Sequence, residues 1–232
     1  MKKNFITAVL LFAAVFANAQ YRVNAGASAG SGASMISFGV EREFNIVSKK
    51  LHVNPGIRFN AFNGSNLDYI TAPAEYTVND DHVDTVRFSN ANSNFANLYV
   101  RIGYDISDKF SLSFDIDIVG VSFGAEQDNL FVRPGKSQRD YYNMNPSLLI
   151  SPAKATPTSI NALLIGDNDL GSLNSTLNLT YNFTKRIAVD AGVGLVFTEY
   201  TTDYGIGYDQ NDRFRNKNMM GYLGVSYLLG DK

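Results

Sequence analysis

The segment Phe110-Ser-Leu-Ser-Phe-Asp-Ile-Asp-Ile118 alternates apolar and polar residues without interruption. Because successive side chains of a β-strand point to opposite faces, one face of this segment is apolar and the other carries Asp115 and Asp117. A strand with large apolar side chains on one face and carboxylates on the other is suited to separate hydrocarbon from a polar interior. The segment therefore predicts a membrane-spanning strand.

The rest of the chain repeats this pattern between connections of unequal length. We interpret seven further alternating segments as strands: 21–30, 36–44, 51–62, 97–104, 173–183, 187–197 and 219–229. The connections near 46–50, 106–109 and 184–185 are tight, whereas 63–92, 125–170 and 201–215 are long and irregular. Short turns at one rim and long loops at the other are typical of outer-membrane barrels.

Alternation alone does not say which face looks outward, because a soluble ligand-carrying barrel alternates too. The polar positions of these segments hold Asn, Ser, Thr, Gly and a few acids, and no lysine lies in the middle of a segment. Aromatic residues gather beside the short turns, as in an interfacial girdle. We therefore predict an all-β fold, a closed eight-stranded antiparallel transmembrane β-barrel with short periplasmic turns and long extracellular loops.

The amino terminus has the three regions of a secretory signal peptide. Lys2 and Lys3 precede an apolar run from Phe5 to Phe16, and Ala17-Asn18-Ala19 offers a cleavage site. We expect residues 1–19 to be removed and 20–232 to form one barrel domain. The predicted location is the outer membrane.

Composition excludes several classes of function. The 20 basic and 22 acidic residues become 18 and 22 once the two signal lysines are removed, which is a net charge of −4 and makes nucleic acid an unsuitable partner. The chain contains no cysteine, which excludes disulfides, cysteine nucleophiles and thiolate metal sites. No cofactor and no resident metal are expected.

With these features the chain resembles the small outer-membrane β-barrel family of Gram-negative bacteria, the superfamily that contains the transmembrane domain of outer membrane protein A. The resemblance rests on architecture and covers the whole mature chain. It implies contact with outer-membrane lipids and lipopolysaccharide. Members of this family usually end on an aromatic residue, whereas this chain continues past Tyr227 through Leu228-Leu-Gly-Asp-Lys232.

The charged residues on the predicted inner face are the first candidate site. They are Glu41, Glu43, Arg58, Arg101, Asp115, Asp117 and Asp190. If the strands on either side of the turn at 106–109 pair directly, Arg101 falls opposite or diagonal to Ser113 and Asp115. One interpretation is a structural salt-bridge network inside the barrel. The other is a gated narrow conduit whose ion pairs exchange partners.

The predicted outer loops supply the second group of candidates. His82 lies in the acidic run Asn79-Asp-Asp-His-Val-Asp84, which is either solvated or able to bind a divalent cation shared with lipopolysaccharide phosphates. Tyr200, Tyr204 and Tyr208 recur at even spacing, either as an exposed ribbon that contacts a partner protein or as an internally packed hairpin.

The leading functional hypothesis is a non-enzymatic outer-membrane scaffold that presents extracellular loops for surface interaction or envelope integrity. The alternative is a narrow, porin-like channel for small solutes. A lipid A-modifying enzyme is the third hypothesis, but it would need a serine, a histidine and an acid near the outer leaflet. Only His82 is predicted on that side.

Overall fold

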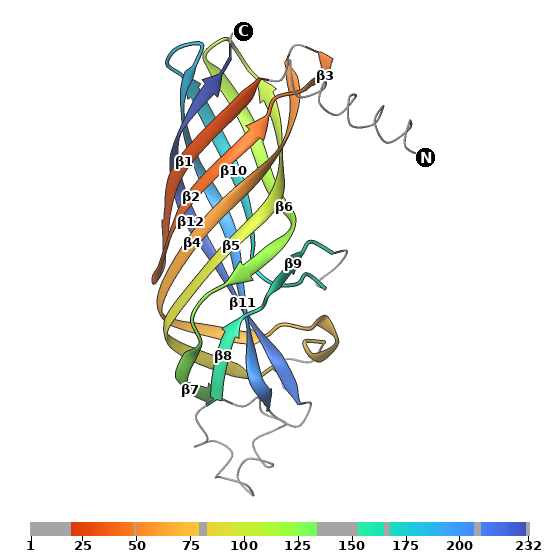
Figure 1. Cartoon of the computed structure of the whole chain (residues 1–232), viewed down its shortest axis with the longest axis vertical. Helices are drawn as coiled ribbons and strands as arrows, with labels where there is room; N and C mark the ends of the chain where they lie inside the picture. Colours follow the sequence, from red (N-terminus) through yellow and green to blue (C-terminus); the bar gives the residue numbers. More distant parts are fainter. Residues whose placement is uncertain are drawn as a thin grey trace, which may run out of the picture.

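The computed structural model describes residues 20–48, 50–78, 83–133, 153–164, 168–206 and 210–230. Within them the chain forms strands and one short 3₁₀ helix (Figure 1). The strands are β1 (Tyr21–Gly30), β2 (Ala33–Arg42), β3 (Asn45–Ser48), β4 (Leu51–Thr71), β5 (Thr85–Asp105), β6 (Phe110–Phe123), β7 (Gln127–Arg133), β8 (Ala153–Pro157), β9 (Ile160–Ala162), β10 (Leu173–Asn182), β11 (Ile187–Ile206) and β12 (Asn211–Leu229). The 3₁₀ helix, η1, is Ala74–Tyr76.

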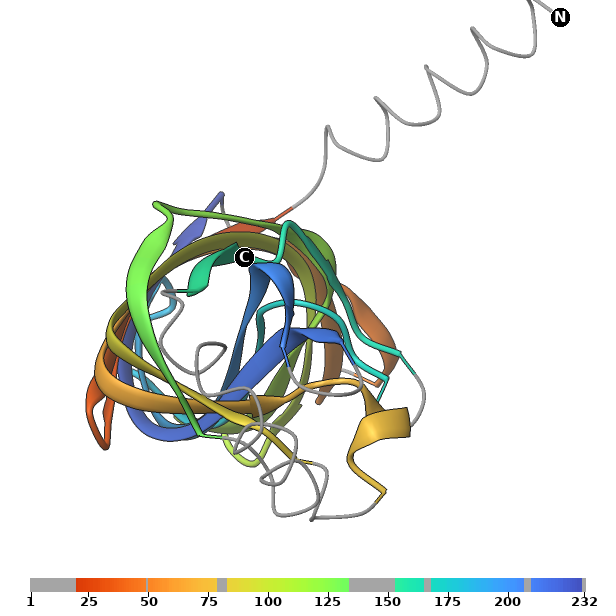
Figure 2. The ribbon, with the colours of Figure 1, turned by 90° about the horizontal axis from the view of Figure 1, so that it is seen from below.

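Eight of these strands form a closed antiparallel ring. In order around the ring they are β1, β2, β4, β5, β6, β10, β11 and β12, and β12 pairs with β1 to close it. Figure 2 shows the ring along its axis. Closure gives both edges of each of these strands a hydrogen-bonding partner. A membrane-spanning strand needs both, because lipid cannot pair with free backbone N–H and C=O groups. The predicted eight-stranded antiparallel barrel is confirmed.

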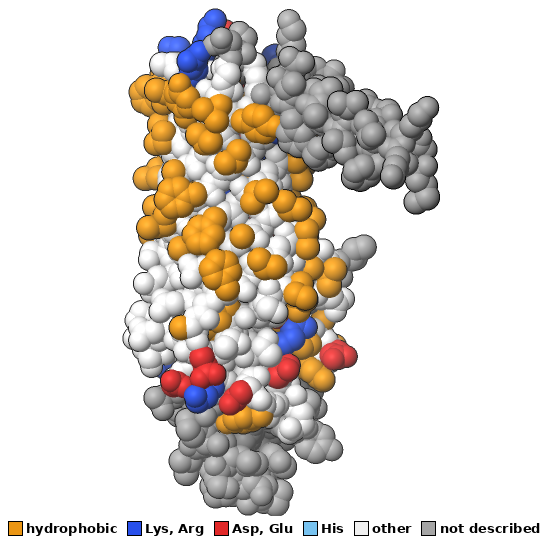
Figure 3. Space-filling view, in the orientation of Figure 1, with side chains coloured by type: hydrophobic (Ala, Val, Ile, Leu, Met, Phe, Trp, Pro, Cys, Tyr) orange, Lys and Arg blue, Asp and Glu red, His pale blue; other side chains and the backbone are white. Residues whose placement is uncertain are grey.

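The apolar face of the ring is outside. On β6, Phe110, Leu112 and Phe114 are 41%, 45% and 41% exposed, whereas Asp115 and Asp117 are 3% and 0% exposed. Hydrophobic side chains cover the middle of the outer surface, and charged side chains appear near its two ends (Figure 3). This apolar belt around a polar interior is the arrangement of a barrel that spans a membrane.

None of the helical structure in the described residues is long and apolar enough to cross a membrane.

The short turns lie together at one end of the barrel. Residues 106–109 and 183–186 connect β5 to β6 and β10 to β11, and β3 lies in the connection from β2 to β4. Phe110 and Tyr181 face each other across β6 and β10 with ring centroids 5.1 Å apart, and Phe183 contacts Tyr181. Phe110 and Phe183 are exposed and Tyr181 is partly buried, and the three rings form part of the expected aromatic girdle at what we call the short-turn end.

At the opposite, long-loop end the predicted loop boundaries are wrong. The sequence predicts a loop over 63–92, but β4 continues to Thr71 and β5 begins at Thr85. Likewise β11 continues to Ile206 and β12 begins at Asn211, within the predicted loop 201–215. The predicted loop 125–170 contains β7, β8 and β9.

These extended strands close a second ring beyond the apolar belt. Around it run β4, β5, β7, β8, β11 and β12, and Phe214 and Arg215 of β12 pair with Thr71 and Ile70 of β4. The β1–β2 hairpin turns back at Ser31–Gly32 and does not take part. We call this six-stranded ring the outer ring.

The polarity of the wall reverses where the outer ring begins. On β4, Asn54, Arg58 and Asn60 point inward within the belt, but Ser65 and Asn66 are both exposed and break the alternation. Asn66 has a positive φ of 52°. Beyond it Leu67 and Tyr69 are buried, whereas Asp68 is partly exposed and pairs with the exposed Arg87 at 2.6 Å. The outer ring is therefore built like a soluble protein, with apolar side chains inside.

Candidate functional site

Two layers of buried side chains occupy the barrel interior. The layer nearer the short-turn end is ionic, and Arg101 and Asp115 form its centre. They lie directly opposite each other on β5 and β6, as pairing about the short turn predicts. Arg101 Nε and Nη2 donate to the two carboxylate oxygens of Asp115 at 2.8 and 2.9 Å. Both side chains are about one-twentieth exposed or less, so this bidentate pair is shielded from water.

A second ion pair extends the layer across the interior. Arg58 of β4 donates to Asp117 Oδ1 at 2.6 Å, and its guanidinium also lies 3.7 Å from Asp115. Asp117 Oδ2 accepts from the Asn97 side chain at 2.8 Å and from the backbone N–H of Asn174 at 2.9 Å. Asp117 therefore has a donor on each oxygen, as a buried carboxylate requires.

Glu41 completes the ionic layer from β2. Its carboxylate accepts from the Tyr99 hydroxyl at 2.6 Å and from the Asn54 amide at 3.1 Å, and it lies 3.5 Å from Arg101. Arg22, which is 3.8 Å from Glu41 and 3.3 Å from Glu43, continues the network toward the short-turn end. Six of the seven predicted inner charges therefore belong to one connected network.

Asp190, the seventh predicted residue, is placed apart from these ion pairs. It is fully buried on β11 and accepts a hydrogen bond from the Thr180 hydroxyl. Its Oδ2 has no hydrogen-bond partner among the described residues. The structure therefore places Asp190 in the interior without an ion pair of its own in the described part of the chain.

A chamber of about 890 Å³ lies between the ionic layer and the short-turn end. Arg101 and Glu41 reach its inner part, and Lys109 and Lys185 of the short turns line its rim. His52, on the wall, lies 4.0 Å from Asp105. The chamber is therefore polar and carries charges of both signs.

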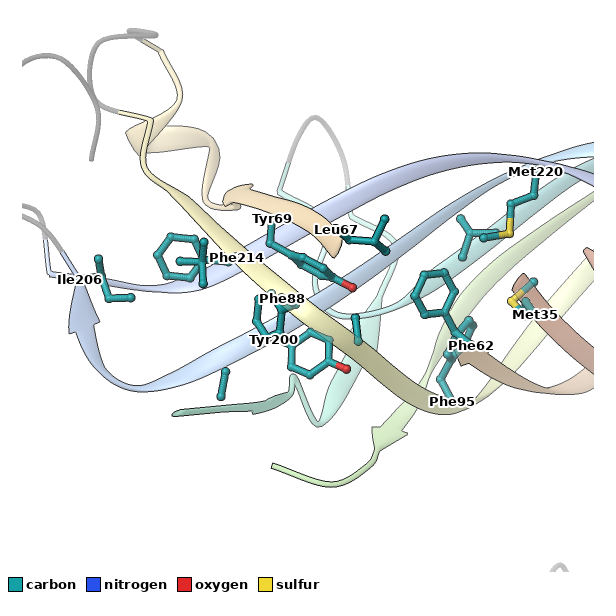
Figure 4. Close-up of a cluster of buried hydrophobic side chains, with 14 residues drawn as sticks. Met35, Phe62, Leu67, Tyr69, Phe88, Phe95, Tyr200, Ile206, Phe214 and Met220 are labelled. Atoms are coloured by element: carbon teal, nitrogen blue, oxygen red, sulfur yellow. The ribbon is translucent and has the colours of Figure 1, made fainter. Parts of the chain in front are cut away.

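The second layer is apolar and fills the long-loop half of the interior (Figure 4). At its centre Tyr69, Phe88 and Tyr200 stack with ring centroids 4.5 to 5.4 Å apart, and each is 0% exposed. The other members of this apolar layer are Ala33, Met35, Phe62, Leu67, Val86, Ala91, Phe95, Ala155, Val196, Ile206, Phe214 and Met220. Sequence reasoning missed this layer because it placed most of these residues in the predicted loops 63–92, 125–170 and 201–215.

Of the two interpretations of the tyrosine series, the packed hairpin holds for Tyr200, which is 0% exposed, and the exposed ribbon does not. Tyr200 occupies an inward position of β11, where its ring packs against Tyr69 and Phe88, and it is the ladder partner of Pro157 of β8. Tyr204, by contrast, is 41% exposed near the end of β11. His82 and Tyr208 lie outside the described residues. Their predicted roles as loop contacts stay predictions.

A further ionic cluster, absent from the predicted site residues, lies on the opposite face of the β11–β12 hairpin. Glu199 and Arg215 are cross-strand partners, and Arg215 Nη2 donates to Glu199 Oε2 at 2.6 Å. Arg213 donates to the other oxygen, Oε1, at 2.8 Å. Both arginines also donate to the backbone carbonyl of Asp169. Glu199 is 0% exposed because the chain before β10 covers it.

In the part of the chain that the structure describes, no three His, Asp or Glu side chains are grouped as metal ligands.

The sequence matches no family model and no curated protein. Among solved structures, the N-terminal β-barrel domain of OprF from Pseudomonas aeruginosa is 8% identical, with 90% of this chain and 97% of that one covered and a TM-score of 0.41. Ail of Yersinia pestis is 11% identical (91% and 97% covered, TM-score 0.37). Neisserial surface protein A is 12% identical (90% and 94% covered, TM-score 0.35).

Proposed function

We propose that this chain is an integral outer-membrane protein that acts as a non-conducting, non-enzymatic scaffold and presents the outer ring at the cell surface. In this proposal the short-turn end faces the periplasm and the long-loop end faces outward. Its partners are outer-membrane lipids and lipopolysaccharide around the belt, and a surface or envelope protein at the outer ring. The observation that carries the proposal is the apolar layer across the long-loop half of the barrel.

Two features of the interior support a closed barrel. Tyr69 and Phe88 come from the neighbouring strands β4 and β5 and meet Tyr200 of β11 inside the outer ring, where all three are 0% exposed. Behind them Arg58 and Arg101 hold their carboxylates with short, charge-assisted hydrogen bonds. A solute crossing the barrel would have to separate both layers.

A narrow conduit is the second candidate, and the chamber at the short-turn end favours it. A polar chamber of about 890 Å³ is large enough for water and small solutes. To conduct, the barrel would need Arg101 to exchange Asp115 for another partner and the aromatic cluster to move aside. The scaffold proposal requires neither movement.

Single-channel recording in planar bilayers separates the two functions. The proteins to compare are the wild type, Arg101→Ala, the double variant Phe88→Ala/Tyr200→Ala, and the triple variant that combines them. We expect no steady current from the first three, because each retains at least one closed layer. The triple variant should pass cations, since Asp115 and Glu41 would then line an open path without Arg101.

The folded state of each variant is checked by circular dichroism and by its resistance to protease in the same lipid. Steady open steps in the wild type that change with Arg101→Ala would reject the scaffold and favour the conduit. A silent wild type together with a conducting triple variant supports the scaffold.

A further inference from the structure

A hairpin leaves the barrel wall between β6 and β10. Its first arm is β9 (Ile160–Ala162), and its second arm returns through Leu170, which exchanges two backbone hydrogen bonds of 2.9 Å with Ala162. Figure 1 shows β9 beside β6, and its three residues pair with Val119, Gly120 and Val121 of that strand. We call the described residues 160–164 and 168–170 the lateral hairpin. The wall stays closed behind it, because β8 and β10 both pair with β11.

Buried polar bonds fix the base of the lateral hairpin. Asn161 is 0% exposed, donates to Asn97 Oδ1 of β5 at 2.7 Å and accepts from the backbone N–H of Ser172 at 2.8 Å. Asn97 in turn donates to the Ser172 carbonyl at 2.9 Å. Gly171, with a positive φ of 72°, makes the return turn, and a Cβ there would overlap the Ile160 carbonyl oxygen.

Residues of β11 and β12 hold the second arm of the hairpin. Arg213 and Arg215 donate to the backbone carbonyl of Asp169, and Glu199 holds both arginines in place. The Asp169 carboxylate accepts from the backbone N–H of Leu164 at 2.9 Å. The direction in which the hairpin leaves the barrel is therefore fixed by its bonds to β5, β11 and β12.

The exposed side chains on the β9 side of the hairpin are apolar, whereas Asn168 on the returning side is exposed and polar. Ile160, Leu163 and Leu164 are 56%, 36% and 49% exposed. Two exposed leucines fixed on the outside of the barrel by a rigid base would be unfavourable in water, since their apolar surface is left uncovered. Contact with an apolar environment would remove this apolar surface from water.

The hairpin continues the lipid-facing surface of β6. Leu163 N donates to the Ile118 carbonyl at 2.8 Å, and Ile160 pairs with Val121, which is itself 52% exposed. The next outward residue of β6, Phe123, contacts Phe59 of the belt with ring centroids 6.2 Å apart. These contacts place the base of the hairpin at the height of the belt and not beyond it.

From this continuity we propose that the lateral hairpin lies in the lipid of the outer leaflet, with Leu163 and Leu164 among the acyl chains. The inference rests on the proposed membrane function and adds a second lipid contact to it. The hairpin extends sideways from the barrel, so it covers lipid that the cylindrical wall does not reach. It would resist rotation and tilt of the barrel in its leaflet.

The absence of cysteine in the native chain allows one label to be placed at a chosen site. Leu164→Cys is labelled with a small fluorophore, and the protein is reconstituted in vesicles of phosphatidylcholine with brominated acyl chains. Leu112→Cys, at a belt position that is 45% exposed, reports contact with lipid, and Arg87→Cys, at an outer-ring position whose side chain is 52% exposed, reports water. Leu163→Cys replaces Leu164→Cys if the latter does not fold.

We expect bromine to quench the label at position 164 to within about twofold of position 112, and iodide in the buffer to quench it far less than position 87. Quenching by iodide alone would place the hairpin in water and overturn the inference. A label protected from both quenchers would be covered by protein, which also overturns it. Bromine quenching at position 112 in the same vesicles shows that the membrane-spanning barrel itself is intact, so failure at 164 concerns the hairpin only.

Discussion

The hydroxyl groups of Tyr69 and Thr198 lie 2.8 Å apart and form a hydrogen bond across the outer ring. Tyr69 belongs to β4 and Thr198 to β11, which are not neighbours in either ring. The bond therefore joins two strands that do not pair with each other, through the apolar layer, where few polar groups are present. The two residues are 129 positions apart in the sequence.

Tyr69→Phe should loosen the outer ring without opening it. The variant keeps the aromatic packing against Phe88 and Tyr200 but leaves the Thr198 hydroxyl without this partner, which costs about 1 kcal/mol of unfolding free energy. Urea unfolding in lipid vesicles measures the change, and hydrogen exchange locates it on β4 and β11. Tyr104→Phe, at a half-exposed belt position, is the matched control. Equal stability of the two variants would show that the bond does not hold the ring.

Buried and exposed ion pairs on the same strands should differ in their contribution to stability. Asp117→Asn removes the charge that Arg58 contacts at 2.6 Å in the interior, and we expect a loss of about 3 to 5 kcal/mol. Asp68→Asn removes the partner of Arg87 at the same distance, but both side chains are more than one-third exposed, so the loss should be below about 1 kcal/mol. Urea titration of both variants tests the difference, and similar losses would contradict it.

Much of the membrane-spanning ring could be predicted from the sequence because lipid imposes a simple rule on each strand. Phe110, Leu112 and Phe114 must face outward and Asp115 inward, whatever the neighbouring strands are. A tight turn then fixes the pairing of the next strand. The contact between Arg101 and Asp115 can therefore be predicted by counting residues outward on each side of the turn at 106–109. Both signals are local.

The outer ring could not be predicted because its signals are not local. Two consecutive exposed residues, Ser65 and Asn66, shift the inward positions of β4, so the alternation appears to end there. Tyr200 is buried against Tyr69 and Phe88, which lie more than 100 residues earlier in the chain. Glu199 and Arg213 meet only once the register of β11 and β12 is known. The clearest sequence signal was the apolar spacing of Leu67, Tyr69, Val86 and Phe88 inside the predicted loop.

Gly120→Ala should destabilise the point where β5, β6 and β9 meet. Gly120 pairs with Asn97 on one side and Asn161 on the other, and a Cβ there would overlap the Ala96 carbonyl oxygen and the Asn97 side chain. We expect a loss of about 1 to 3 kcal/mol from this overpacking. Gly221→Ala is the control, because the nearest atom to its Cβ would be 3.9 Å away. Urea unfolding of both variants is the measurement, and a neutral Gly120→Ala would show that the strands can separate without cost.

The outer ring should open in alkaline solution while the membrane-spanning ring stays folded. Tyr69 and Tyr200 lie beyond the belt, and burial raises the pKa of each hydroxyl above its ordinary value of 10.0. The unfolded ring therefore releases these protons at a lower pH than the folded ring does. The contribution of these two hydroxyl groups to the stability of the outer ring is fully present below about pH 10. It falls as the pH rises from there toward the raised pKa values of the folded ring.

Hydrogen exchange of the β4 and β11 extensions, followed together with tyrosinate absorbance, tests this alkaline opening. Loss of protection and ionisation should occur together, whereas the paired backbone of β6 and β10 stays protected. The double variant Tyr69→Phe/Tyr200→Phe has no hydroxyl to ionise at these positions, so its outer ring should keep its protection over the same pH range. If the wild-type tyrosines ionise while β4 and β11 remain protected, water reaches them in the folded ring and the apolar layer does not seal the barrel.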